Sequence, residues 1–364
     1  MVHQRFSIYL AYTSLFLTGL QACTVSEPLS TEPYDTGVVV LEEGQPGKSN
    51  ASVSLLPING PVLTTIFATV NKRTLGNLLR SYTEIDGKGY LVVSQNDKVE
   101  VIENSTFRNI AIIDKGLEYP RYLIAGPPQN GLFLKGYVSY WGGKTLAPGV
   151  AVISLADRKV IKQIPVGAGP EQLVVVGDQL FVANSGGSGI DRTISVINTT
   201  TDQVVATIPV GDAPASMVYE PVGGLIHVLC SGRPVGTTGG GNTTAELIRI
   251  NPATRQIVNR VTIGGKPIFG NPSNLIYHAG SRTLYFLLTG AIYAVPVNAT
   301  TVSVDKPLIN RSFYGLGVEP TTGIIYGADA RDGLTNGLVR RYQPNGARID
   351  SVSVGLLPNG FYFK

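Results

Sequence analysis

The chain has 364 residues and is rich in glycine (43) and proline (23), whereas charged residues make up only 15% and the formal net charge is +4. No cluster of lysine and arginine is found, which argues against a nucleic-acid-binding groove. No long apolar period of 3.6 residues follows residue 23, and the strand-forming types Val, Ile, Thr and Tyr dominate instead. The composition therefore predicts a large domain built from short strands.

The first 23 residues predict an export signal. Arg5 lies in a short N-terminal region, residues 8–20 are mostly apolar, and Leu20-Gln21-Ala22-Cys23 matches a lipobox, in which Cys23 would be lipidated. The apolar run is short for a membrane span, and an ordinary secretory signal with a chance cysteine is the alternative. We expect a signal peptide at residues 1–22, a flexible tether at 23–36 and a folded domain at 37–364.

A repeated phrase organises the folded domain. Residues 164–170 (IPVGAGP) return as residues 208–214 (IPVGDAP), and each copy leads into an apolar run, a glycine-containing turn and a strand. Weaker copies lie at 262–267 and 352–358. The copies recur at intervals of roughly 50 residues, and such a period with strand-only content predicts a β-propeller or another β array.

Seven sets of three outer strands can be counted in chain order. They are 37–42, 51–57 and 62–69; 89–94, 98–103 and 109–114; 131–140, 149–154 and 160–166; 179–184, 193–198 and 203–210; 224–230, 245–251 and 256–263; 282–288, 291–297 and 302–308; and 323–328, 337–342 and 347–354. Inner strands precede all but the first set, at 79–85, 121–125, 172–176, 216–220, 273–278 and 313–318.

The first set lacks an inner strand, and residues 359–364 form a spare strand at the end of the chain. If these pair, the ring closes and no sheet edge is left exposed to aggregation. We therefore predict an all-β fold, a seven-bladed β-propeller closed by the C-terminal strand in the first blade.

Loop lengths indicate which face carries function. With strands A to D numbered from axis to rim, the A–B and C–D connections read as short turns, whereas the B–C connections at 43–50, 141–148, 185–192, 231–244 and 329–336 are longer. B–C and D–A connections share one face, and long loops on a rigid scaffold commonly carry binding. Tolerated insertions are the alternative.

The repeat also resembles a known group. With residues 180–184 (LFVAN) and 194–198 (ISVIN), it resembles the YncE-like, YVTN-repeat propellers. Residues 42–44, 50–54, 75–76, 119–122, 314–316 and 355–363 more specifically resemble the DUF5074-type surface lipoproteins of Bacteroidetes. This resemblance covers roughly residues 37–364.

The resemblance implies a lipid-anchored protein of the outer membrane, on the cell surface or on the periplasmic face. Some relatives capture corrinoids such as vitamin B12 and hand them to a TonB-dependent transporter, so a corrinoid ligand and such a transporter are the implied partners. Surface-export signals of this lineage favour several acidic residues after the lipidated cysteine, whereas here only Glu27 follows closely.

The sequence offers few residues that suit catalysis. His3 lies in the predicted signal, His227 lies in a predicted strand, His278 ends one, and no Cys/His cluster with metal-ligand spacing exists. Cys230 falls in an apolar strand and reads as a buried, inert thiol. The glycine-rich segment 185–189 lacks the following lysine and helix of a phosphate-binding loop. We expect no enzymatic activity, no cofactor and no metal; a propeller lyase with a His–Glu pair is the remaining alternative.

Binding candidates gather on the long-loop face, where Trp141 offers an aromatic anchor and Arg121 opens an inner strand near the channel mouth. Packing between blades is the alternative for Trp141, and pairing with a neighbouring carboxylate is the alternative for Arg121. The candidate ligand-binding residues are Arg121, Tyr122, Tyr140, Trp141, Asn184, Arg233, Tyr314, Asp329 and Arg331. We expect a monomeric ligand-capturing domain, with a protein-interaction scaffold in the cell envelope as the alternative.

Overall fold

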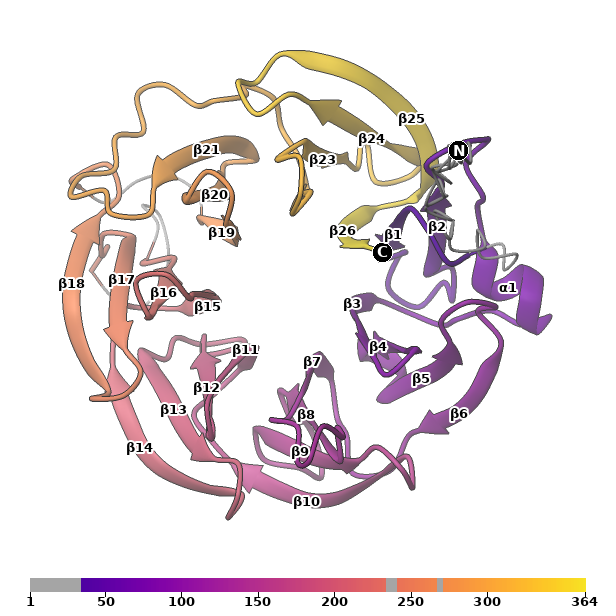
Figure 1. Ribbon diagram of the computed structural model, residues 1–364, viewed down its shortest axis with the longest axis horizontal. Helices are drawn as coiled ribbons and strands as arrows, with labels where there is room; N and C mark the ends of the chain where they lie inside the picture. Colours follow the sequence, from indigo (N-terminus) through magenta and orange to yellow (C-terminus); the bar gives the residue numbers. More distant parts are fainter. Residues whose placement is uncertain (1–33, 234–240, 267–270) are drawn as a thin grey trace, which may run out of the picture. The chain divides into compact units, whose positions relative to one another are not determined.

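The computed structural model describes residues 34–233, 241–266 and 271–364. The predicted signal peptide at 1–22, the predicted lipidation site Cys23 and most of the predicted tether at 23–36 lie outside these residues. The compact unit at residues 32–364 contains seven antiparallel sheets arranged around a central axis (Figure 1). The predicted seven-bladed β-propeller is confirmed.

Each complete blade is a four-stranded meander whose first strand is innermost. The second blade consists of β3 (Leu79–Ile85), β4 (Lys88–Val93), β5 (Lys98–Glu103) and β6 (Asn109–Ile113), with the 3-10 turn η1 (Ser94–Asn96) after β4. The third consists of β7 (Pro120–Ala125), β8 (Lys135–Tyr140), β9 (Gly149–Ser154) and β10 (Lys159–Pro165). The fourth consists of β11 (Pro170–Val176), β12 (Gln179–Asn184), β13 (Thr193–Asn198) and β14 (Gln203–Pro209).

The remaining blades follow the same order, with two exceptions. The fifth blade consists of β15 (Pro214–Glu220), β16 (Leu225–Cys230), β17 (Glu246–Asn251) and β18 (Gln256–Thr262). The seventh consists of β22 (Gly315–Val318), β23 (Ile325–Asp329), β24 (Asn336–Tyr342) and β25 (Arg348–Leu356). The sixth has only β19 (Ser273–His278), β20 (Thr283–Leu288) and β21 (Ala291–Pro296), and the first joins β1 (Val38–Glu42) and β2 (Ser52–Leu56) to the C-terminal β26 (Pro358–Phe363).

The C-terminal strand closes the ring, as the sequence predicts. β26 pairs antiparallel with β1, with Val38 opposite Phe363 and Val40 opposite Phe361. The ring of Phe361 lies 5.7 Å from that of Tyr326 in the seventh blade, measured between centroids. The Lys364 N–H donates to the Gly37 carbonyl at 3.0 Å. The two ends of the domain are therefore joined by sheet pairing and by packing between blades.

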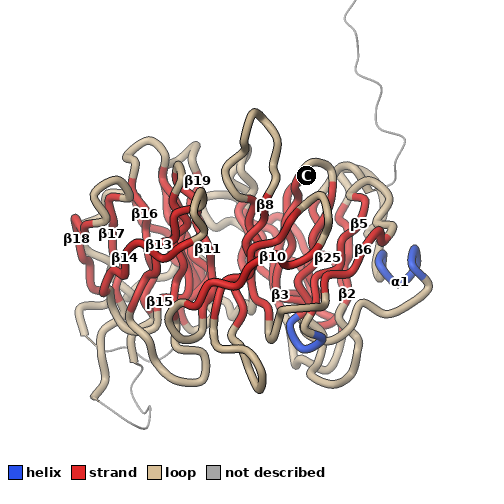
Figure 2. The backbone as a smooth tube through the Cα atoms, turned by 90° about the horizontal axis from the view of Figure 1, so that it is seen from below, coloured by secondary structure: helices blue, strands red, loops and turns tan. Residues whose placement is uncertain are grey.

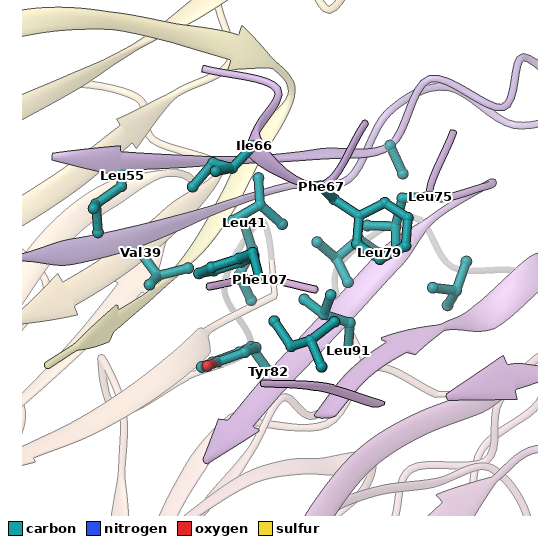
Figure 3. Close-up of a cluster of buried hydrophobic side chains, with 14 residues drawn as sticks. Val39, Leu41, Leu55, Ile66, Phe67, Leu75, Leu79, Tyr82, Leu91 and Phe107 are labelled. Carbon is teal, nitrogen blue, oxygen red and sulfur yellow. The ribbon is translucent and has the colours of Figure 1, made fainter. Parts of the chain in front are cut away.

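The predicted strand at 62–69 in the first blade is wrong. Only an isolated bridge joins Leu63 to Leu55, and a short helix, α1 (Ile66–Asn71), follows. Ile66 and Phe67 are adjacent in the chain and both are buried in the core between the first and second blades (Figure 3). A strand would turn one of two adjacent side chains outward, whereas a helical turn buries both, which explains the difference.

The predicted strand at 302–308 in the sixth blade is also wrong. In its place stand isolated bridges, a parallel one between Ile263 and Val302 and an antiparallel one between Ile292 and Ile309. Val302 is buried with the core that the fifth and sixth blades share, so this segment leans toward the neighbouring sheet. Pro307 has no N–H to donate to a ladder, which disfavours continuous pairing.

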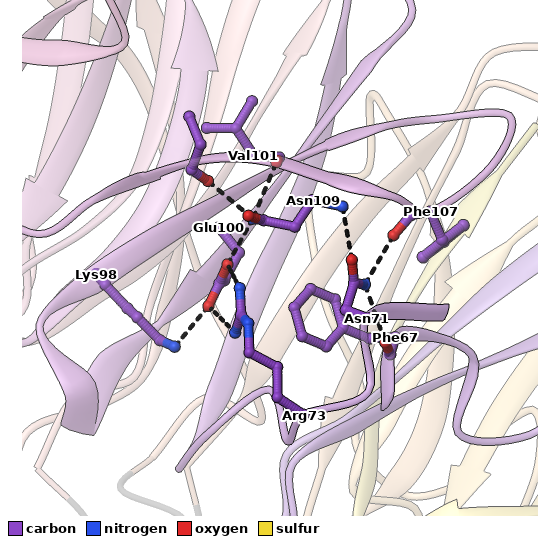
Figure 4. A network of polar contacts seen from close by, with 9 residues as sticks. Phe67, Asn71, Arg73, Lys98, Glu100, Val101, Phe107 and Asn109 are labelled. Carbon is purple, nitrogen blue, oxygen red and sulfur yellow. Dashed lines mark hydrogen bonds and ion pairs between the residues drawn. The ribbon is translucent and has the colours of Figure 1, made fainter. Parts of the chain in front are cut away.

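A network of polar contacts fixes α1 to the second blade (Figure 4). Glu100 of β5 is completely buried, and both of its carboxylate oxygens accept hydrogen bonds from Arg73 at 2.7 Å. Lys98 and Asn109 donate to the same carboxylate at 2.6 and 2.7 Å. A buried carboxylate is stable only when its charge is compensated in this way, so the segment after α1 is tied to the sheet.

The central strands are buried on both faces because each sheet packs between two neighbours. In β12, residues 180–184 are all completely buried, whereas the rim strand β14 is largely exposed. Cys230 of β16 is also buried, and burial raises the pKa of its thiol to about 12, as fits the inert thiol that the sequence predicts. No helix within the described ranges is long and apolar enough to cross a membrane.

Figure 2 shows the strands running between two faces that carry the connecting loops. We call the face with the D–A and B–C connections the loop face. The opposite face holds mostly tight turns, but residues 126–134 form a longer A–B connection than the sequence predicts, because β8 begins only at Lys135. Pro127 and Pro128, which cannot donate to a ladder, precede an isolated bridge between Gln129 and Leu132 in this loop.

Candidate functional site

The ends of the inner strands at the loop face enclose a cavity of about 390 Å³ on the propeller axis, which we call the axial cavity. Every blade contributes to its wall. The lining residues are Glu43, Arg80, Arg121, Tyr122, Glu171, Gln172, Ala215, Ser216, Ser273, Asn274, Leu287, Gly290, Phe313, Tyr314 and Asn359. This volume falls within the range of about 300–1,000 Å³ that is usual for small-molecule sites.

A repeated backbone geometry points these side chains toward the axis. A residue with positive φ precedes the first proline of several inner strands, as in Tyr119 (φ 50°), Gly169 (φ 58°), Ala213 (φ 53°) and Leu357 (φ 54°). The register of the inner strand then shifts directly after the proline, a β-bulge, in the first, third, fourth and fifth blades. Bulges re-aim side chains, so the residues just after the proline leave the regular pleat and line the cavity.

One side of the axial cavity holds an ion pair backed by the only tryptophan. The Arg121 guanidinium lies 3.0 Å from the Glu171 carboxylate, and both side chains are about one tenth exposed. The guanidinium carbon also lies 4.3 Å from the centre of the Trp141 ring, a cation–π contact. Trp141 donates its indole N–H to Glu171 at 3.1 Å. The three side chains hold one another, so Arg121 is oriented before any ligand arrives.

A second ion pair lies on the seam between the first, second and seventh blades. Glu43, which is buried, accepts a hydrogen bond from the Tyr314 hydroxyl at 2.5 Å and pairs with Arg80 at 2.9 Å. Burial, and next the Glu43 charge, raise the pKa of the Tyr314 phenol to about 12. The phenol therefore stays protonated at neutral pH and keeps its hydrogen bond to Glu43.

Polar atoms at the cavity wall remain without partners. Within the described part of the chain, the buried Nε of Arg80 and the buried Oδ1 of Asn359 make no hydrogen bond, although the Asn359 amide nitrogen donates to the Leu79 carbonyl at 2.9 Å. Tyr122 nearby has its pKa raised to about 12 by burial and next by the Glu171 charge. An unsatisfied buried donor and acceptor cost free energy, so this part of the wall is not optimised for stability alone.

The fifth and sixth blades give the cavity an uncharged side. Gln172 of the fourth blade accepts hydrogen bonds from the Ser216 hydroxyl at 3.0 Å and the Met217 N–H at 2.7 Å. The Ser216 hydroxyl in turn accepts the Leu275 N–H at 2.8 Å. These contacts link three adjacent blades, and Ala215 beside them presents only a methyl group to the cavity.

A second cavity of about 360 Å³ adjoins the first at the seventh blade, and we call it the arginine lobe. Phe313 and Tyr314 line both cavities. The other lining residues of the arginine lobe are Arg311, Ser312, Asp329, Ala330 and Arg331. The loop face therefore carries two neighbouring polar cavities that share two lining residues.

The structure brings most of the sequence-predicted residues to these two cavities. Arg121, Tyr122 and Tyr314 line the axial cavity, Tyr314, Asp329 and Arg331 line the arginine lobe, and Trp141 lies behind Arg121. Three predicted residues lie elsewhere. Tyr140 is buried in a blade core, Asn184 is buried and donates to Thr193 and Ser195, and Arg233 pairs with Asp212 at 3.1 Å.

The sequence reasoning missed Glu43, Arg80, Glu171 and Asn359. A positional signal was present for Glu171 and Asn359, because each directly follows the proline that opens an inner strand, as Arg121 does. Arg80 occupies the same second position of β3, after Leu79. Glu43 has no such signal, since it follows an outer strand of the first blade.

The comparisons with known proteins support the fold and leave the activity open. A family model described as "Domain of unknown function (DUF5074)" matches residues 36–363. No curated protein matches the chain.

Among solved structures, a quinonprotein alcohol dehydrogenase-like protein from Bacteroides thetaiotaomicron VPI-5482 has a TM-score of 0.63 at 12% identity, over 91% of this chain and 78% of its own. A functionally unknown protein from Desulfotomaculum acetoxidans DSM 771 has a TM-score of 0.63 at 11% identity, over 90% and 98%. Hydrazine synthase from Kuenenia stuttgartiensis has a TM-score of 0.54 at 15% identity, over 75% and 85%. At these identities the likeness shows the fold alone.

Proposed function

The chain belongs to the DUF5074 family, whose description assigns no function, and from that premise we propose that it is a binding protein whose site is the axial cavity. The observation that carries this proposal is the charged wall of that cavity. Arg121 with Glu171, and Arg80 with Glu43, place two ion pairs at the axis in side chains that are largely buried. Burying ion pairs seldom adds stability over apolar packing, so a structural role alone explains them poorly.

Binding explains the cavity better than catalysis does. Among the described residues that line it there is no histidine or cysteine, and each of its two carboxylates is paired with an arginine. A carboxylate already engaged by an arginine is a poor candidate for a general base. His227 and His278 lie in β16 and at the end of β19, outside the cavity wall.

A concave polar site also favours a small ligand over a flat protein-interaction surface. The cavity presents Arg121 and Tyr122 directly, and Trp141 supports Arg121 from behind. The exposed apolar side chains on the ring are spread over many blades, from Ile58 in the first to Leu334 in the seventh. Scattered apolar residues are normal on any surface, whereas a docking patch is contiguous.

Corrinoids are the first ligands to test, because the sequence resembles corrinoid-capturing lipoproteins. A whole corrinoid is larger than the axial cavity, so only a polar arm would enter it and the ring would lie across the loop face. We further propose that Cys23 anchors the protein at the outer membrane and that a TonB-dependent transporter receives the ligand. A polar arm would then meet Arg80, Arg121 and Asn359 at the cavity wall.

The test fills the cavity without removing a charge. Ala215→Trp places a large side chain in the cavity wall, and Val222→Trp places the same side chain in an exposed turn of the same blade on the opposite face. Cobalamin, cobinamide and a panel of small polar metabolites are screened by thermal shift, and any ligand found is measured by calorimetry. We expect Ala215→Trp to weaken binding more than about tenfold and Val222→Trp to leave it unchanged.

The proposal fails if the ligand binds Ala215→Trp as tightly as the parent protein. It also fails if the parent binds no member of the panel at millimolar concentration.

A further inference from the structure

The arginine lobe carries a positive charge that the axial cavity does not. In the axial cavity, each arginine is matched by a glutamate. In the lobe, Asp329 is the single carboxylate among the described lining residues. Its Oδ2 forms ion pairs with the guanidinium groups of Arg340 at 2.7 Å and Arg311 at 3.2 Å. Arg331, on the loop after β23, brings a third guanidinium close to Asp329, so positive charge exceeds negative charge among the lining residues.

Asp329 is fully committed to its partners. One carboxylate oxygen meets Arg340 and Arg311, and the other accepts the Arg331 backbone N–H at 3.0 Å. Burial raises the pKa of Asp329, but the hydrogen bonds from Arg340, the Arg331 N–H and Arg311 outweigh it and lower the pKa below its ordinary value. The aspartate is thus a fixed anion that positions the surrounding arginines, and its ion pairs are made with Arg340 and Arg311 and not with the Arg331 side chain.

The two lobe arginines are accessible. The Arg311 side chain is about half exposed, and Arg331 is exposed on the B–C loop of the seventh blade. Within the described ranges, no carboxylate lies within ion-pair distance of the Arg331 guanidinium. Arg331 also has a φ of 53°, so its backbone adopts the left-handed conformation that β-branched and bulky residues avoid. The loop therefore holds an unpaired guanidinium beside a cavity at a conformational cost.

We propose that the arginine lobe is an oxyanion subsite that takes a carboxylate or phosphate group of the ligand whose remainder occupies the axial cavity. Guanidinium groups bind such groups through two parallel hydrogen bonds, and Arg311 and Arg331 line one cavity of sufficient size. Phe313 and Tyr314 line both cavities, so a ligand that extends past these two side chains would have one part at the axis and one in the lobe. This inference rests on the proposed function and specifies in addition that the ligand carries a negatively charged group.

The experiment uses inorganic phosphate and succinate as separate probes, titrated by calorimetry at constant ionic strength. The variants are Arg331→Gln and Arg311→Gln, with Arg348→Gln as the matched control. Arg348 is exposed on the rim strand β25, where its guanidinium donates only to Ser351. The comparison of phosphate with succinate distinguishes the two sources of the oxyanion.

We expect at least one probe to bind the parent and Arg348→Gln equally, and about tenfold more weakly to Arg331→Gln and Arg311→Gln. Melting temperatures check the fold of each variant. Arg331→Gln is the decisive one, because the exposed, unpaired side chain supports no core. Equal affinity of the parent and Arg331→Gln for both probes, or no binding of either probe at millimolar concentration, overturns the inference.

Ala215→Trp separates this inference from the proposed function. Its enlarged side chain fills the axial cavity and leaves the lining residues of the lobe unchanged. Phosphate or succinate should bind it as they bind the parent. If Ala215→Trp loses an organic ligand while Arg331→Gln keeps its full affinity for that ligand and for both probes, the lobe is not a subsite and the axial site stands. If the probes depend on Arg331 while Ala215→Trp loses no ligand, the lobe stands and the axial site fails.

Discussion

Ring closure leads to a stability prediction that depends on two blades at opposite ends of the chain. Phe361 of β26 packs in the core of the seventh and first blades, against Tyr326 and beside Val40 and Val339. Gly317 of β22 faces the same ring, and a Cβ built on Gly317 would lie 2.7 to 2.9 Å from atoms of the Phe361 side chain. Real side chains do not approach so closely, so Gly317 and Phe361 are fitted to each other.

Each substitution alone should destabilise the protein. Phe361→Ala leaves a cavity in a partly exposed core, and the lower end of the usual range for phenylalanine, about 3 kcal/mol, applies. Gly317→Ala adds a methyl group where the ring already lies, which commonly costs about 1–3 kcal/mol. Gly317 does not have a positive φ, so the backbone itself accepts alanine.

The two substitutions together should cost less than their sum. Once Phe361 is reduced to alanine, the ring atoms nearest the added Cβ are gone and only the Cβ of residue 361, at 2.9 Å, still lies close to it. The clash is therefore partly relieved, and we expect about 0.5–1 kcal/mol of favourable coupling. The assay is urea unfolding followed by circular dichroism and by the fluorescence of Trp141, the single tryptophan. Coincidence of the two probes shows that one cooperative transition is measured.

The control combines Phe361→Ala with Gly149→Ala in the third blade. A Cβ at Gly149 would lie 2.4 Å from the Tyr140 hydroxyl oxygen, a comparable clash that does not involve Phe361. That pair should be additive within about 0.5 kcal/mol. If the Gly317 and Phe361 substitutions are equally additive, β26 does not pack against β22 and the closure described above is refuted.

Two further predictions concern the chain outside the site. Cys23→Ala should move the protein from the membrane fraction to the soluble fraction and abolish the incorporation of labelled fatty acid. A variant that stays with membranes in high salt would contradict the lipid anchor. Burial and next the Arg249 charge lower the pKa of His227 to about 4 in the folded protein, whereas the ordinary value is about 6.5. Between these two values the unfolded chain binds a proton that the folded protein does not bind. The free energy of unfolding should therefore fall by about 3 kcal/mol as the pH drops from 6.5 to 4. His227→Leu should weaken this fall in urea unfolding, because neither ring nitrogen has a partner within the described residues, and an unchanged pH profile would contradict the assignment.

The blades could be predicted from the sequence because each strand depends on local features. The phrase at 164–170 and 208–214 combines a rim strand, a turn and the proline that opens an inner strand, and its recurrence sets the period. Closure could be predicted because the first blade lacked an inner strand and the chain ended with a spare one. The two wrong strands, at 62–69 and 302–308, lie where tertiary packing outweighs β propensity, as the burial of both Ile66 and Phe67 illustrates.

The candidate site was less predictable because its contacts join blades that are far apart in the chain. Arg121 and Tyr314 could be placed near the axis by their position at the start of inner strands. Their partners could not, since Tyr314 meets Glu43 across 271 positions and Arg121 meets Glu171 across 50. Only the angular arrangement of the blades determines which carboxylate lies beside which arginine.

The side chains that line the cavities differ in type from one part of the ring to another. Blades one to four supply the two ion pairs, blades five and six supply Ala215, Ser216 and Asn274, and blade seven leads into the arginine lobe. A ligand that satisfies all three has hydrogen-bonding groups toward the ion pairs, an uncharged part toward blades five and six, and an anion toward Arg311 and Arg331. Several lining residues, among them Arg121, Glu171 and Asn359, lie at bulges rather than in the buried pleat, so their side chains can differ without altering a blade core. The same scaffold can therefore carry different binding specificities, and the fold alone does not identify a ligand.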